Sequence, residues 1–137
     1  MHKQKVKRLA VFTKEILTFF NGCGSLKEKK LPIKLGYAIK KNISAVGDAV
    51  KAYDAEYREL VDKYGTKDEN GNLMEENGCC PIEDGPAFKK DLDELLDIET
   101  EVNIHTITEE ELRNCDDPRY DPLSVSDLDT LEIMIKE

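Results

Sequence analysis

The sequence has 137 residues, of which 36% are charged, and a formal net charge of −9. A chain of this length fits one domain and buries roughly two thirds of its unfolded surface, so no disulfide is required for stability. Its longest apolar stretches fall well short of the ~20 residues that cross a bilayer, and no secretory leader is recognisable. We therefore expect a single cytoplasmic domain over residues 1–137, with reduced thiols and no membrane partner.

Charge is divided unevenly along the chain. Residues 1–51 carry 12 Lys and Arg against 3 Asp and Glu, a balance of +9, whereas residues 52–137 carry 8 against 26, a balance of −18. Two packed halves with solvated faces of opposite sign explain this arrangement. Alternatively, the acidic half competes for a basic surface on a partner, or the basic half touches nucleic acid. The negative total repels phosphate, so non-specific DNA binding is not expected.

The N-terminal segment repeats apolar side chains at helical spacing from residue 4 to about residue 20. This pattern predicts a mostly buried N-terminal helix within residues 1–25. Gly22 is expected to end the helix as a left-handed cap. The alternative is an edge strand over residues 3–12, but the alternation at Gln4, Val6 and Arg8 is poor. We expect the helix.

A long second helix is predicted over residues 32–64. Pro32 suits a first helical position, and Gly65 closes the helix. Between them, a heptad seam covers residues 39–64: Ile39, Ile43, Val46, Val50, Tyr53, Tyr57, Leu60 and Tyr64. Such a helix is roughly 50 Å long and outspans a compact domain of this size. We expect it to pack on the first and third helices or on a second copy of itself.

The start of this helix, residues 31–43, is apolar and basic in almost equal measure. We interpret it first as a helix start and only secondarily as a binding surface. Its predicted core side chains are Ile33, Leu35, Ile39 and Ile43. Its lysines are Lys34, Lys40 and Lys41. Positive charges near a helix N-terminus interact unfavourably with the helix dipole, so local helix stability does not explain them.

Residues 66–85 are rich in turn formers, and Asn70-Gly71 predicts a turn in an irregular loop or short hairpin. An acidic helix-strand-helix part over residues 86–137 follows. Pro86 begins a helix that runs to about Asp97, and residues 98–106 alternate as the clearest strand. This strand requires a partner, which is the loop around Leu73, the extreme N-terminus or another chain.

The C-terminal segment contains two helix starts. Thr108 and Glu111 form a capping box for a short helix, and Ser124 or Ser126 caps a last helix. The expected inward side chains of that helix are Val125, Leu128, Leu131, Met134 and Ile135. The predicted fold is mainly α, of the α+β type. A long central helix packs with N-terminal, middle and C-terminal helices, and a short strand or hairpin completes the fold.

The sequence contains no glycine-rich phosphate loop, nucleophile elbow or His-Glu-x-x-His pattern. His105 lies on the predicted strand, where it is either a base beside Asp97 or Glu101 or, more commonly, a polar residue on a half-exposed face. We expect a protein that is not an enzyme. We assign no catalytic, cofactor-binding or metal-ligating residues.

Two other site types are less favoured. A zinc site would need His105 together with cysteines, of which the chain has Cys23, Cys79, Cys80 and Cys115. Cys79 and Cys80 are adjacent, and no Cys-x-x-Cys spacing occurs. We therefore expect no metal and no cofactor. Nucleic-acid binding is not the expected function, because the chain contains no recognised binding motif. The basic residues and the tyrosine that could serve it are Lys3, Lys5, Lys7, Arg8, Lys27, Lys29, Lys30, Lys34 and, for stacking, Tyr37.

The order of segments resembles a family of small uncharacterised proteins encoded by bacteriophages and prophages of Gram-positive bacteria. The similarity covers about residues 26–137 and rests on a Leu-Pro turn, a Lys-Tyr-Gly helix end, a Glu-Val-Asn-Ile strand and a terminal Leu/Met/Ile helix. Here these are Leu31-Pro32, Lys63-Tyr64-Gly65, residues 101–104 and residues 128–135. The resemblance implies a fold and a phage origin, with no catalytic residue. Residues 74–85 depart from the family's polar linker, which leaves a role for Cys79 and Cys80 open.

The expected function is that of a non-enzymatic phage accessory protein in the host bacterial cytoplasm. It binds a host or phage protein through acidic and hydrophobic surface, and inhibition of a host defence system is its specific form. The alternative is a virion assembly or chaperone-like protein. Such a protein forms a homo-oligomer through the heptad seam of residues 39–64.

Overall fold

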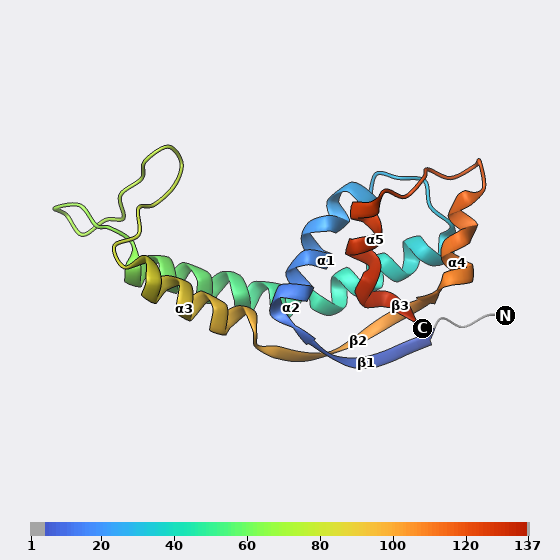
Figure 1. The fold of residues 1–137 in the computed structure, drawn as a ribbon, viewed down its shortest axis with the longest axis horizontal. Coiled ribbons are helices and arrows are strands. Elements are labelled where there is room, and N and C mark those ends of the chain that lie inside the picture. The colour runs from blue at the N-terminus through green and yellow to red at the C-terminus, as the bar shows by residue number, and fades with distance from the viewer. Residues whose placement is uncertain (1–4, 137) are drawn as a thin grey trace.

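The computed structural model describes residues 5–136, so Lys3 and Gln4 of the predictions above lie outside the described residues. Its elements, in chain order, are β1 (Lys5–Phe12), α1 (Thr13–Leu26), α2 (Ile33–Tyr64), α3 (Gly85–Leu96), β2 (Glu99–Thr108), α4 (Glu109–Arg113), η1 (Asn114–Asp116), α5 (Val125–Leu131), η2 (Glu132–Met134) and β3 (Ile135–Lys136). The fold is mainly α with a small sheet, as predicted. The first half of α2 lies between the sheet and the α1–α5 pair (Figure 1). No helix among residues 5–136 is long and apolar enough to cross a membrane.

The predicted N-terminal helix is wrong in its first half, because β1 is a strand and α1 begins only at Thr13. β1 pairs antiparallel with β2, from Lys5 opposite Thr106 to Phe12 opposite Glu99. The extreme N-terminus is thus the partner that the β2 strand requires. Pairing with a distant strand satisfies the backbone groups of every second residue of β1 and buries Val11, which outweighs the local helical pattern.

Gly22 does not end α1, which continues to Leu26. The glycine lies inside the helix where α1 meets α5, and a Cβ atom there would overlap the side chain of Thr130. Gly22 is therefore required for close helix packing and not for a left-handed cap.

The long helix is confirmed over Ile33–Tyr64, with Gly65 as its C-cap. Leu35 and Ile39 are buried as predicted, and Ile43 is partly buried against the same core. Ile33, in contrast, is 86% exposed. Residues that share a helix face are three or four apart, and Ile33 lies two residues before Leu35, away from this stripe.

Asn42 is the polar residue within the buried stripe of α2. Its side-chain Nδ2 donates a 2.9 Å hydrogen bond to the carbonyl of His105, and its Oδ1 accepts a 2.7 Å bond from the His105 amide. Two residues further along β2, Ile107 pairs with Ile135 of β3. At His105, which lies before the part of β2 that pairs with β3, the Asn42 side chain therefore makes the backbone hydrogen bonds that a neighbouring strand would make.

The last helix, α5, is capped by Ser124 as predicted, because the Ser124 hydroxyl accepts a bond from the amide of Asp127. The predicted inward face is only partly correct. Leu131 and Met134 are fully buried, but Val125 is 77% exposed and Leu128 is also exposed. The face that meets α1 includes the polar side chains of Asp127 and Thr130, which an apolar periodicity does not reveal.

Asp127 is a buried carboxylate that ties α5 to the end of α1 and the connection after it. Its Oδ2 lies 2.7 Å from Lys29 Nζ and accepts a bond from the Ser124 amide, while Oδ1 accepts a bond from Ser25 Oγ. Burial raises the pKa of the Asp127 carboxyl, but the hydrogen bonds from Lys29 and Ser124 outweigh burial. The pKa of Asp127 therefore lies below its ordinary value.

We expect Asp127→Asn to lower the free energy of unfolding by about 2 kcal/mol at neutral pH, because the Lys29 ammonium loses its carboxylate partner and keeps the carbonyl of Pro122. A depressed folded-state pKa stabilises the fold above the ordinary value of about 4, and this stabilisation is lost as the pH falls through the folded-state pKa. Urea denaturation at about pH 7 and about pH 2.5 should therefore show a smaller difference at the acidic pH. The exposed Asp129→Asn is the control. An equal loss at both pH values would contradict the assignment.

Candidate protein-binding surface

The second half of α2, the connection after it and α3 form a projection, here called the arm (residues 51–97). Figure 1 shows the arm extending away from the body, which comprises the sheet, α1, α4, α5 and the first half of α2. Val50 is the last buried residue of α2, and α3 contains no buried residue. The arm is thus an antiparallel helix pair with a large surface and a thin apolar interior.

Aromatic side chains hold the two helices of the arm together. Tyr53 stacks on Tyr57 with ring centroids 5.8 Å apart, and Phe88 of α3 meets Tyr57 and Tyr64 edge-on at 6.2 and 6.1 Å. The Tyr64 hydroxyl also donates a 2.6 Å hydrogen bond to Asp91. The tyrosines of the predicted heptad seam therefore pack within the chain. Tyr57 nevertheless remains 39% exposed.

The tip of the arm (residues 65–84) contains two tight turns. The predicted Asn70-Gly71 turn is present, with Gly71 at φ 80° and the Asp68 carboxylate accepting bonds from the amides of residues 70 and 72. A second turn at Asn77-Gly78, which was not predicted, joins Glu76 to Cys79 through reciprocal backbone bonds of 2.7 and 2.9 Å. Both central residues of this turn have positive φ, which is typical of an Asn-Gly hairpin.

The arm is strongly acidic. Residues 51–97 contain 14 Asp and Glu against 6 Lys and Arg, a balance of −8. The ion pairs of the arm are Lys63 with Asp91, Lys67 with Asp62, and Asp97 with Lys14 of the body. Most other acidic side chains of the arm face solvent, and within residues 5–136 they have no ion-pair partner. The field of the arm is therefore negative along both helices and the tip.

Comparisons with protein-family models, curated proteins and solved structures find no match to this chain. Its function is therefore inferred from its own geometry and charge.

The zinc ligands considered above lie in different parts of the molecule. Cys79 and Cys80 lie at the tip of the arm, whereas Cys23 and Cys115 are buried in the body and His105 is on β2. Among residues 5–136 no three metal-ligating side chains gather. Burial raises the pKa of the Cys23 thiol to about 11 and also raises the pKa of Cys115, so both thiols are protonated at neutral pH.

His105 does not contact the two carboxylates considered as its partners. Asp97 pairs with Lys14, and Glu101 lies 2.6 Å from Arg8. The imidazole instead meets the ring of Tyr37 edge-on at 6.2 Å, and its buried Nδ1 has no hydrogen-bond partner among residues 5–136. This arrangement supplies neither a nucleophile nor an orienting carboxylate.

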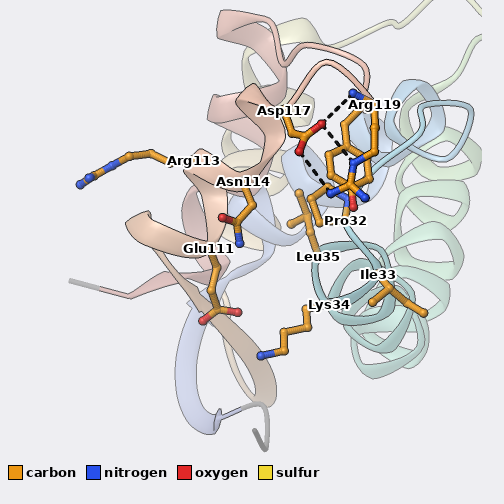
Figure 2. Close-up of a pocket in the computed structure, with 10 residues that line it drawn as sticks. Pro32, Ile33, Lys34, Leu35, Glu111, Arg113, Asn114, Asp117 and Arg119 are labelled. Carbon is orange, nitrogen blue, oxygen red and sulfur yellow. Dashed lines mark hydrogen bonds and ion pairs between the residues drawn. The ribbon is translucent and has the colours of Figure 1, made fainter.

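An open hollow of about 480 Å³ lies between the first turn of α2 and residues 111–120. In Figure 2 Arg119 forks onto Asp117 through two contacts of 3.1 Å, and Arg113 points away from the hollow. Glu111 serves the capping box with Thr108. The lining residues include no cysteine, histidine or serine. Asp117 and Arg119 neutralise each other, and Arg113 pairs with Glu109 outside the hollow, which makes the hollow a weaker candidate than the arm.

Among residues 5–136, the predicted basic residues lie in three different parts of the chain: β1, the connection after α1, and the start of α2. Arg8 lies on β1 and pairs with Glu101, and Lys29 is joined to Asp127. On α2, the Lys41 ammonium lies over the ring of Tyr37, 5.5 Å from its centroid. Basic side chains and the stacking tyrosine are thus engaged within the chain at three separate places.

Proposed function

We propose that this chain is a non-enzymatic accessory protein that binds another protein through the arm. One observation carries the proposal: a balance of −8 is concentrated on a projecting helix pair with mostly exposed acidic side chains. In the proposed complex the arm occupies a basic surface that the partner uses for nucleic acid. Lysine and arginine side chains that bind phosphates also bind rows of carboxylates.

The shape of the arm supports the same partner class. Residues 51–64 of α2 form a rod about 20 Å long, and α3 runs beside it (Figure 1). Carboxylates therefore follow an elongated surface, as phosphates do along a nucleic acid strand. With the resemblance to phage-encoded proteins, we propose a host defence protein of the bacterial cytoplasm as the partner.

The alternative, a virion assembly or chaperone-like oligomer, requires the heptad seam to face another copy. Val46 and Val50 of the seam are buried inside the body, and Tyr57 packs on Phe88. An oligomer through the whole seam would have to displace these contacts. We therefore place this alternative second.

The test compares three immobilised forms of the protein in a lysate of a susceptible bacterium. The arm variant combines Glu56→Gln, Glu59→Gln, Asp93→Asn and Glu94→Gln. The matched control removes the same number of charges from exposed positions of the body: Glu110→Gln, Asp116→Asn, Asp129→Asn and Glu132→Gln. Proteins bound at low and high salt are identified by mass spectrometry, and their affinities are then measured with purified components.

We expect wild-type and control proteins to retain a nucleic-acid-binding host protein that high salt and added DNA release. The arm variant should bind it at least about tenfold more weakly, because the lost charges contribute through long-range attraction. Equal retention by the arm variant would overturn the proposal. So would recovery only of phage structural proteins or of a defined oligomer of the protein itself.

A further inference from the structure

β1 is an edge strand with one uncovered side. The sheet order is β1-β2-β3, so β2 occupies the centre and β1 has a neighbour on one side only. In Figure 1 no helix or loop formed by residues 5–136 lies beyond β1 on its outer side. Four residues of β1 are exposed to solvent: Val6, Lys7, Arg8 and Ala10. An uncovered edge presents backbone groups to which another strand can bind.

The register identifies which backbone groups face outward. In an antiparallel pair, the amide and carbonyl of one residue point to the same side, and successive residues alternate. Both backbone groups of His105 bond to Asn42, on the side of β2 away from β1. Val6, which is opposite His105, therefore does not bond to β2, and the same alternation applies to Arg8 and Ala10.

Two further bonds agree with this alternation. The amide of Phe12 bonds to Glu15 Oε1 at 3.1 Å and not to β2, whereas the amide of Thr13 bonds inward to the carbonyl of Ile98 at 2.9 Å. The open edge is therefore formed by the amides and carbonyls of Val6, Arg8 and Ala10. These three residues leave six backbone groups available for a strand.

Charge selects the occupant of the open edge. Residues 5–12 contain three basic residues and no acidic residue. A second copy that pairs symmetrically through β1 would bring Lys7 and Arg8 close to the same side chains of its partner, and like charges opposite one another destabilise a strand pair. An acidic strand has the complementary charge. β2 already provides such a contact, because Glu101 reaches Arg8 across the existing pair.

We propose that the open edge binds an extended acidic segment of a partner protein, which adds to β1 as a fourth strand. Backbone hydrogen bonds to Val6, Arg8 and Ala10 would provide affinity, and Lys7 and Arg8 would select for acidic side chains. This site is on the body, at a distance from the arm in Figure 1. The inference therefore does not rest on the function proposed for the arm.

The probe is a fluorescent, capped peptide Glu-Thr-Glu-Val-Asn-Ile-His-Thr, which copies the β2 residues 99–106. The test variant is Ala10→Pro, which removes an outward amide but no bond to β2, since proline is tolerated on the solvent side of an edge strand. Ala10→Val is the matched control because it keeps the amide. We expect the peptide to bind wild type and Ala10→Val, and to bind Ala10→Pro at least tenfold more weakly, with similar thermal unfolding of all three proteins.

Two N-methylated peptides test strand addition on wild-type protein, so the inference remains testable even if Ala10→Pro fails to fold. One peptide is methylated on every second backbone nitrogen, and the other peptide on the remaining nitrogens. Because successive amides of a strand point to opposite edges, each peptide has one blocked edge and one free edge. Strand addition predicts that one peptide loses binding and the other keeps it, whereas general charge attraction predicts that both bind alike. Equal binding of both, tight binding of a lysine-substituted peptide, or no binding of the acidic peptide would overturn the proposal.

Two further measurements separate this site from other possibilities. The arm variant described above should bind the peptide as wild type does, so failure at one site leaves the other proposal standing. Light scattering with size-exclusion chromatography measures self-association. A wild-type dimer that Ala10→Pro converts to a monomer would assign the open edge to a second copy and overturn the acidic-segment proposal.

Discussion

Asn42→Leu is expected to lower the free energy of unfolding by about 3 kcal/mol, although it makes the core more apolar. The leucine side chain has a similar size but cannot bond to the backbone of His105. The His105 amide and carbonyl would then be left inside the protein without partners, and each such group costs about 1–3 kcal/mol. The gain in apolar surface does not compensate for two unpaired backbone groups.

The measurement is urea denaturation, with Ser44→Leu as the control on the exposed side of α2. The control should change stability by no more than about 0.5 kcal/mol. Native-state hydrogen exchange adds a local readout, because the His105 amide should lose protection in Asn42→Leu. A variant as stable as wild type, with the His105 amide still protected, would show that Asn42 is dispensable.

The elements that the sequence predicted well are those whose causes are local. The bounds of α2 follow from Pro32, Gly65 and the apolar stripe between them, and the α4 start follows from Thr108 and Glu111. β1 was mistaken for helix because its partner lies more than 85 residues away in sequence. Asn42 could not be recognised either, because its two bonds are made to a strand 63 residues away.

In the candidate surface, too, features with local causes were predictable and features that depend on distant contacts were not. The acidic bias of the second part of the chain is visible in the sequence, and so is the heptad seam. The sequence does not reveal that coverage by the body ends after Val50, or that Phe88 covers the tyrosines beyond it. Whether an apolar seam is available to another chain depends on which side chains of the same chain reach it. The projection of the arm is therefore a property of the assembled fold.

Gly22→Ala is expected to destabilise the protein by about 2 kcal/mol, within the range of about 1–3 kcal/mol that is usual for an added group in a tightly packed interior. The new Cβ atom would overlap Oγ1 and Cγ2 of Thr130, a buried side chain whose hydroxyl is bonded to the carbonyl of Ser126. Relief requires either a rotation that breaks this bond or a shift of α5 away from α1. The helical propensity of alanine recovers only about 1 kcal/mol.

Gly24→Ala is the matched control, because it lies in the same helix with open space around its Cα. It should stabilise the protein by about 0.5–1 kcal/mol, so the two glycine substitutions are expected to have opposite signs. Combining Gly22→Ala with Thr130→Ala should reduce the penalty, since two of the overlapping atoms are then absent, and urea denaturation of the double-mutant cycle measures this coupling. If Gly22→Ala stabilises the fold as much as Gly24→Ala does, the helices are not in close contact at this point, and Gly22 has no packing role.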